Sequence, residues 1–250
     1  MSRHSKWSKI KHQKGAEDAK RGALFTRLAK AIMLAAREGG SGDPKMNFKL
    51  RLAIDQARVA NLPKENVERA IQKGLGSSAE GATIERAQYE GFLPGGAAII
   101  IDSLTDNKNR TSGVIKHLLG KYGGNLGGPN SVLRMFEKRG VIKIKNEKLK
   151  MKNEKERITL LAIESGAEDI GEEGEEDDEL TIYTKPENLQ TLKDGLEKEN
   201  INLDYTEIEL LPKEKLDVQG LSLKKDIENL LNELDDNEEI NNYYTNLGEF

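Results

Sequence analysis

The sequence predicts an α+β protein of several small domains: an N-terminal three-helix bundle followed by two small ferredoxin-like α/β domains. The chain has 250 residues, which is enough for two or three domains of ordinary size. Only 36% of the residues are apolar and 33% are charged, which favours several small lobes over one large core. After the polar, glycine-rich residues 76–81, the hydrophobic period changes from that of helices to that of strands.

Three helices are expected before this change of period, over residues 18–37, 48–60 and 63–74. In the first helix, Leu24, Leu28 and Ile32 recur at steps of four residues, which places them on one face. Asn47 is a suitable N-cap for the second helix, and Pro63 suits the first turn of the third. Helices of this length with one apolar face each form a small bundle.

Short strands and helices alternate in the rest of the chain. We expect strands at residues 87–92, 97–104, 132–136, 141–145, 180–184, 203–210 and 240–244. The helices between them are expected at residues 109–122, with Asn109 as N-cap, around 158–162, after Pro186 and around 223–234. The glycine-rich residues 123–128 are expected to be a flexible connection or a surface turn, and Gly140 is expected to separate two strands. This alternation is typical of small sheets with helices on one face, as in ferredoxin-like folds.

The N-terminal segment of residues 3–14, called the tail below, is basic and almost free of apolar groups. It contains no acids, and its cations are Arg3, Lys6, Lys9, Lys11 and Lys14, with two histidines, His4 and His12. Such a segment cannot bury enough surface to fold alone, and a phosphate backbone would neutralise it by releasing condensed counterions. Trp7 can stack on an unpaired base or anchor in a protein groove. A plain solvated tail is the alternative.

The charge of the chain is unevenly distributed. Residues 1–80 carry 17 Lys and Arg against 8 Asp and Glu, whereas residues 81–250 carry 22 against 35. This division indicates that the basic part meets nucleic acid while the acidic part keeps the protein soluble. A net charge of −4 therefore does not exclude a nucleic-acid partner.

Signatures of catalysis, metals and cofactors are missing from the sequence. The absence of cysteine excludes disulfides, thiolate metal sites and a cysteine nucleophile. His117 is interpreted as a lone, partly buried histidine, and residues 123–128 lack the spacing of a nucleotide-binding loop. Ten acids between Glu164 and Glu179 do not follow the calcium-loop pattern and are interpreted as a solvated loop. We expect no enzyme, no cofactor and no metal; a hydrolase or transferase with an unfamiliar site is the disfavoured alternative.

No membrane segment is expected, because the longest apolar runs are far too short to span a bilayer. The N-terminus also lacks the apolar core of a signal peptide. A cytoplasmic protein is therefore expected.

Six segments in this order resemble the YebC/PmpR family, which also includes the mitochondrial translational activators of cytochrome c oxidase I. They are HSKWSKIKHQKGAEDAKRG (residues 4–22), ARVANLPKENVERAI (57–71), YEGFLPGG (89–96), TDNKNRT (105–111), GGNLG (123–127) and SGAED (165–169). The resemblance implies three domains, the third inserted in the second. On this view residues 1–80 form the tail and bundle, 81–133 with 206–250 the middle domain, and 134–205 the insertion.

The resemblance implies a non-enzymatic regulator of gene expression. Family members are described as probable DNA-binding transcriptional regulators, and others are linked to translation on the ribosome at difficult sequences such as proline runs. The expected partner is therefore DNA, with ribosomal RNA and the ribosome as the alternative. Neither reading involves a membrane.

Two groups of residues are the candidate nucleic-acid contacts. The main contact set is Lys6, Trp7, Lys9, Lys11, His12, Lys14, Lys20 and Arg21, and the second contact set is Asn107, Lys108 and Arg110. Lys108 stands where arginine is common in the family; lysine keeps the charge but loses the bidentate fork. The turn of residues 128–130, between GGNLG and Ser131, is a second departure from the family pattern.

Overall fold

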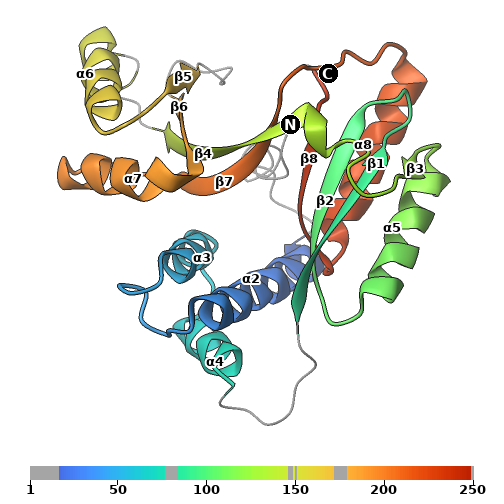
Figure 1. The fold of residues 1–250 in the computed structure, drawn as a ribbon, viewed down its shortest axis with the longest axis horizontal. Coiled ribbons are helices and arrows are strands. Elements are labelled where there is room, and N and C mark those ends of the chain that lie inside the picture. The colour runs from blue at the N-terminus through green and yellow to red at the C-terminus, as the bar shows by residue number, and fades with distance from the viewer. Residues whose placement is uncertain (1–16, 77–83, 146–148, 150, 172–178, 249–250) are drawn as a thin grey trace. The chain divides into compact units, whose positions relative to one another are not determined.

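A computed structural model describes residues 17–76, 84–145, 149, 151–171 and 179–248 (Figure 1). The chain divides into two compact units: a first unit of Met1–Glu137 with Leu211–Phe250, and a second unit of Lys138–Leu210. The second unit overlaps the insertion expected at residues 134–205. The helical segment belongs to the same unit as the first sheet, and side chains of the helical segment donate hydrogen bonds to backbone carbonyls near the last strand of that sheet.

The predicted three-helix bundle is present as α2 (Glu17–Gly39), α3 (Phe48–Val59) and α4 (Lys64–Gly74). Its core is made of small and branched apolar side chains: Leu28, Ile32, Ala36, Leu50, Ala57 and Ala70. Asn47 caps α3, because its side chain accepts from the Leu50 amide at 3.1 Å. The side-chain nitrogen Nδ2 of Asn47 donates to the Ala35 carbonyl at 2.8 Å and so ties the start of α3 to α2.

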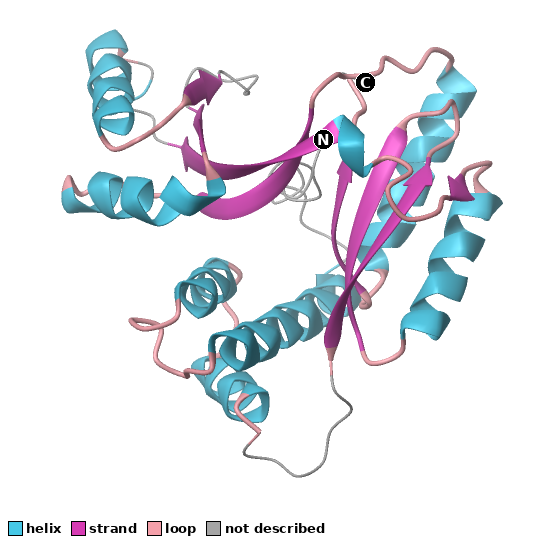
Figure 2. Ribbon diagram, viewed as in Figure 1, coloured by secondary structure: helices cyan, strands magenta, loops and turns pink. Residues whose placement is uncertain are grey.

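The first sheet has the order β3-β1-β2-β8. Its strands are β1 (Glu85–Phe92), β2 (Ala98–Thr105), β3 (Asn125–Leu126) and β8 (Ile240–Thr245). Two helices, α5 (Lys108–Lys121) and α8 (Leu221–Asp236), flank it (Figure 2). Ile99 and Ile101 of β2 form a core with Ile115 of α5 and Leu230 of α8, so both helices cover the same face.

The second unit contains the other sheet, of order β5-β6-β4-β7. Its elements are β4 (Phe136–Lys145), α6 (Lys152–Glu164), β5 (Asp169–Gly171), β6 (Glu179–Thr184), the 3₁₀ turn η3 (Pro186–Asn188), α7 (Leu189–Lys198) and β7 (Tyr205–Pro212). The chain order βαββαβ and this strand order are those of a ferredoxin-like fold. The first sheet has another order, because β1 and β2 pair as a hairpin. The α+β class with helices first and two small sheet domains after them is confirmed.

Three local predictions were wrong. The 3₁₀ turn η1 (Leu133–Met135) occupies most of the strand expected at residues 132–136, and β4 runs through Gly140 without a break. A Cβ on Gly140 would lie 2.9 Å from Cγ2 of Thr184, so this glycine allows close packing inside a strand and does not end one. His117 is exposed on α5, not partly buried.

Other predicted elements differ in their bounds or in their content, β1 and β7 among them. The helix predicted to have Asn109 as its N-cap has Asn107 as its N-cap and begins at Lys108. The glycine-rich residues 123–128 include the edge strand β3, in which Leu126 pairs with Gly91. This pairing requires glycine at position 91, since a Cβ there would lie 2.7 Å from the Asn125 carbonyl oxygen. Of the predicted acidic loop, residues 169–171 form β5, and residues 172–178 lie outside the described residues.

Candidate nucleic-acid interface

Most of the main contact set lies outside the described residues: Lys6, Trp7, Lys9, Lys11, His12 and Lys14. Lys20 belongs to α2, and the description of side chains begins at Arg21. Arg21 is exposed, and its guanidinium carbon lies 5.3 Å from the centre of the Phe25 ring. The tail therefore precedes a helix whose first described cation faces solvent.

The second contact set lies where β2 ends and α5 begins. Asn107 serves as the N-cap, accepting from the Arg110 amide at 3.0 Å. Its carboxamide oxygen is therefore already used by the helix. Lys108 extends toward β1, where its Nζ lies 2.6 Å from Oε2 of Glu85.

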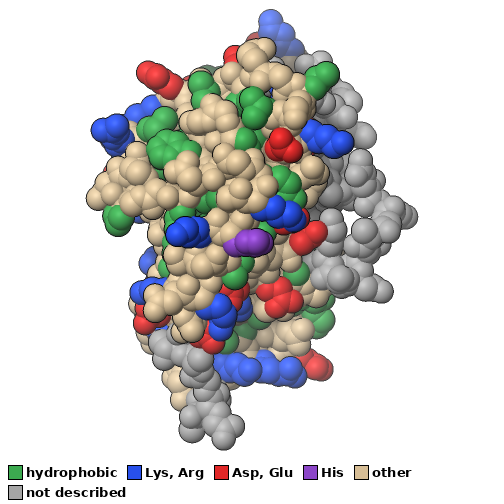
Figure 3. All heavy atoms as spheres, turned by 90° about the vertical axis from the view of Figure 1, so that its right-hand side faces the viewer, with side chains coloured by type: hydrophobic (Ala, Val, Ile, Leu, Met, Phe, Trp, Pro, Cys, Tyr) green, Lys and Arg blue, Asp and Glu red, His purple; other side chains and the backbone are tan. Residues whose placement is uncertain are grey.

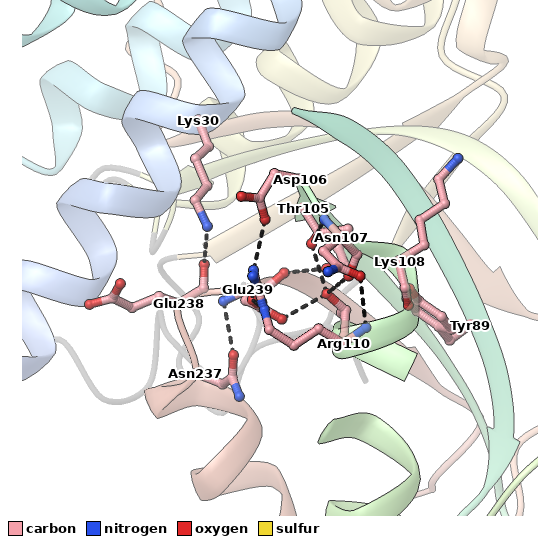
Figure 4. Close-up of polar contacts among 12 residues, drawn as sticks. Lys30, Tyr89, Thr105, Asp106, Asn107, Lys108, Arg110, Asn237, Glu238 and Glu239 are labelled. Atoms are coloured by element: carbon pink, nitrogen blue, oxygen red, sulfur yellow. Dashed lines mark hydrogen bonds and ion pairs between the residues drawn. The ribbon is translucent and has the colours of Figure 1, made fainter. Parts of the chain in front are cut away.

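Arg110 is held by two carboxylates (Figure 4). Its Nε donates to Oε1 of Glu239 at 2.8 Å, and one of its terminal nitrogens donates to Oδ1 of Asp106 at 2.7 Å. Cations in the first turn of a helix face the positive end of the helix dipole, which is unfavourable. Nearby carboxylates offset this, so the local arrangement explains why Lys108 and Arg110 are tolerated there.

Glu239 is the centre of this network. It belongs to the connector, defined as residues 237–239 between α8 and β8, and its side chain is only 18% exposed. The buried Thr111 hydroxyl lies 2.7 Å from its Oε2, and the Ser103 hydroxyl donates to its carbonyl oxygen at 2.5 Å. The connector is thus bound to β2 and to the first turn of α5.

The same connector binds the bundle. Lys30 of α2 donates from Nζ to the Glu238 carbonyl at 3.2 Å (Figure 4). Arg27, which is buried, donates to the carbonyl of Asp235 at 2.5 Å and lies 3.4 Å from that of Asn237. The helix that follows the tail and the loop that carries the second contact set therefore meet at the connector.

The ion pairs of this region shift the pKa values of their members in the expected directions. Hydrogen bonding to Lys108 lowers the pKa of Glu85, and hydrogen bonding to Glu85 raises that of Lys108. Arg110 lowers the pKa of Asp106 in the same way. Burial, followed by the charge of Glu239, raises the pKa of Tyr89, whose hydroxyl donates to the Lys108 carbonyl at 2.9 Å. All the cations of the second contact set are thus compensated by acids inside the protein.

Acids and cations are also interspersed over the face seen in Figure 3. On α5, Lys121 pairs with Glu233 of α8 at 2.5 Å. Exposed pairs of this kind contribute about 0 to 1 kcal/mol each. A phosphate could replace such a carboxylate at little cost, but it must compete with that carboxylate for the cation.

Neither a cluster of metal ligands nor a membrane-spanning helix occurs in the described part of the chain. Its His, Asp and Glu residues form no group of three or more that could hold a metal ion. Among these residues there is also no helix with the length and apolar character needed to cross a bilayer.

Sequence reasoning did not single out Glu90, Arg27 or Glu239. Glu90 is an acid at a buried position of β1, and its side chain accepts from the amides of Asn130, Val132 and Leu133 at 2.7 to 2.8 Å. An acid at a buried strand position is a signal for such a role. Nothing in the local sequence signals the partners of Arg27 and Glu239, because those partners are far away in the chain.

The chain belongs to the TACO1/YebC family. The family's N-terminal domain matches residues 5–77, and its second and third domain matches residues 84–247. This confirms the resemblance seen in the sequence motifs.

Similar proteins cover the whole chain. A protein of Syntrophomonas wolfei is 43% identical to this chain and covers 99% of it. A protein of Desulfosudis oleivorans is 46% identical and covers 98%. Each is called "Probable transcriptional regulatory protein", and in each case the match covers 96% of the relative's own length. A crystal structure of a conserved hypothetical protein from Aquifex aeolicus is 37% identical, with a TM-score of 0.83 over 97% of this chain and 96% of that one.

Proposed function

We propose that this protein is a non-enzymatic, nucleic-acid-binding regulator of gene expression that acts in the cytoplasm as a DNA-binding transcriptional regulator. The observation that carries the proposal is the tail, with five cations and no acids in residues 3–14. The names of the relatives from Syntrophomonas and Desulfosudis support a regulatory role.

The two contact sets differ in available charge, and this favours the tail as the primary contact. Lys108 and Arg110 already have carboxylate partners in Glu85, Asp106 and Glu239. Phosphate must compete with these carboxylates, whereas the tail has no acid within its own sequence. Binding through the tail releases counterions from the nucleic acid, which makes the affinity strongly dependent on salt.

The test is a salt series of fluorescence anisotropy titrations with duplex DNA, single-stranded DNA and structured RNA. Changing Lys6, Lys9, Lys11 and Lys14 to alanine should flatten the slope of log affinity against log salt by about 3 to 4 units, at about 0.7 to 0.9 per contact. The matched control changes four exposed lysines elsewhere, Lys116, Lys198, Lys213 and Lys225, to alanine. It alters the net charge equally and should leave the slope nearly unchanged. Equal slopes for wild type and the tail variant would contradict the proposal.

Trp7→Ala separates stacking from charge. Loss of one stacked base costs about 1 to 3 kcal/mol and should weaken binding to unpaired nucleic acid at every salt concentration, with little change in slope. A preference of the wild-type protein for promoter duplexes over RNA would support a role in transcription. A tryptophan effect confined to structured RNA would instead move the function to translation on the ribosome.

A further inference from the structure

A hollow of about 230 Å³ lies on the outside of the bundle, and the function proposed above makes no use of it. Four of its lining residues, Arg51, Ile54, Asp55 and Arg58, recur at steps of three, one and three along α3 and therefore share one face of that helix. The other two are Pro44 and Lys45, from the turn before α3. The turn and the helix face together form its walls.

The lining combines apolar groups with cations. Pro44 and Ile54 supply apolar surface, and three cations, Lys45, Arg51 and Arg58, face a single acid, Asp55. The volume is below the roughly 300 to 1,000 Å³ of pockets that hold cofactor-sized ligands. The hollow is large enough for one flat ring with an apolar face, and its cations would attract a negative charge next to that ring.

Two cations of the hollow, Lys45 and Arg58, are less compensated than those of the second contact set. Arg58 lies 3.5 Å from Asp55, and its side chain is 78% exposed, so this pair is weak. Lys45 is exposed; its backbone amide donates to Oδ1 of Asp43 at 2.9 Å, and its ammonium group forms no ion pair with the residues that the structure describes. Arg51 stacks against Phe48, with 5.5 Å between its Cζ and the ring centre, which restrains its guanidinium plane.

We propose that this hollow binds one unpaired base of single-stranded nucleic acid, with Lys45 and Arg58 contacting the phosphates on either side of it. Bases stack on guanidinium planes and on apolar side chains regardless of sequence, and Lys and Arg track the backbone beside them. Met46, which follows Lys45 in the sequence, is 79% exposed. This inference rests on the proposed function and adds a second contact, on the folded bundle, to that of the tail.

The first test compares two double variants of the full-length protein by anisotropy with a labelled single-stranded RNA. Lys45→Ala with Arg58→Ala removes the two cations of the hollow. Lys64→Ala with Lys73→Ala is the matched control, because Lys64 also pairs with an acid at 3.5 Å, Glu68, and Lys73 has no such partner in the described part of the chain. The hollow variant should flatten the salt slope by about 1.4 units, at about 0.7 per single-strand contact, and the control should not. Thermal melting checks that both variants keep the bundle folded.

The second test locates the base. RNA with 4-thiouridine at a single position is cross-linked to the wild-type protein by ultraviolet light, and the attached peptide is identified by mass spectrometry. Cross-links to residues 44–58 support the hollow. If the protein binds RNA through the tail but cross-links elsewhere and the two double variants behave alike, the hollow is not a site and the proposed function stands. If the wild-type protein binds neither DNA nor RNA, both this proposal and the proposed function fail.

Discussion

Arg27 in the middle of α2 donates a hydrogen bond to the carbonyl oxygen of Asp235, near the end of α8, at 2.5 Å. The last carbonyls of a helix have no partner within the helix, and a cation beside them also interacts favourably with the helix dipole. A buried arginine of the bundle therefore completes a helix of the first sheet domain. This explains in physical terms why the bundle and the first sheet fall in one compact unit.

Arg27→Met should lower the free energy of unfolding by about 1.5 to 3 kcal/mol, the range for hydrogen bonds to a charged group. Methionine keeps most of the buried apolar stem, so the loss reports the guanidinium. Urea denaturation followed by circular dichroism measures it. Arg69→Met, at an exposed position of α4, is the control and should change stability by less than about 0.5 kcal/mol. Equal midpoints for the two variants would show that the Arg27 contact contributes nothing.

Glu90→Ala should be among the more destabilising changes in the first sheet. The Glu90 side chain is 8% exposed and accepts three backbone amides, so its removal leaves donors without their charged acceptor. We expect a loss of about 2 to 4 kcal/mol and faster hydrogen exchange at residues 130–133. Gln88→Ala, on the same strand but exposed, should have little effect on either measurement. Unchanged exchange at residues 130–133 would mean that other contacts hold this turn.

Acid should destabilise the junction between β1, β2 and α5. The pKa of Glu85 lies below its ordinary value of 4.5, and that of Asp106 lies below 3.8, because Lys108 and Arg110 donate to them. A carboxyl whose pKa is lower in the folded state contributes stability that is present above the unfolded pKa. This contribution is lost as the pH falls through the folded pKa.

The measurement is the free energy of unfolding of the wild type and of the Glu85→Gln, Asp106→Asn double variant between neutral and acidic pH. The wild type should lose stability more steeply below about pH 4.5, and the two curves should converge in acid. Parallel curves would show that these two pairs do not contribute. A salt series at neutral pH should reduce the difference, since both pairs are exposed.

The sequence by itself determined the class of fold and most of the elements. The stripes of Leu28 and Ile32 in α2, and of Leu230 and Leu234 in α8, are local patterns that only a helix can place on one face. The N-cap at Asn47 and the positive charge of the tail are also local features of the sequence. Each depends on residues within a few positions of one another, so each could be predicted without knowledge of the fold.

Only the tertiary structure decided which cations are available to a partner. Arg110 meets Glu239, 129 residues away, and Arg27 meets Asp235, 208 residues away, because the sheet order places β8 beside β2. The role of Gly140 likewise depends on Thr184 of the neighbouring strand. None of these three contacts leaves a pattern in the nearby sequence, since Coulomb attraction and close packing act between neighbours in space. Those neighbours come together only when the chain has folded.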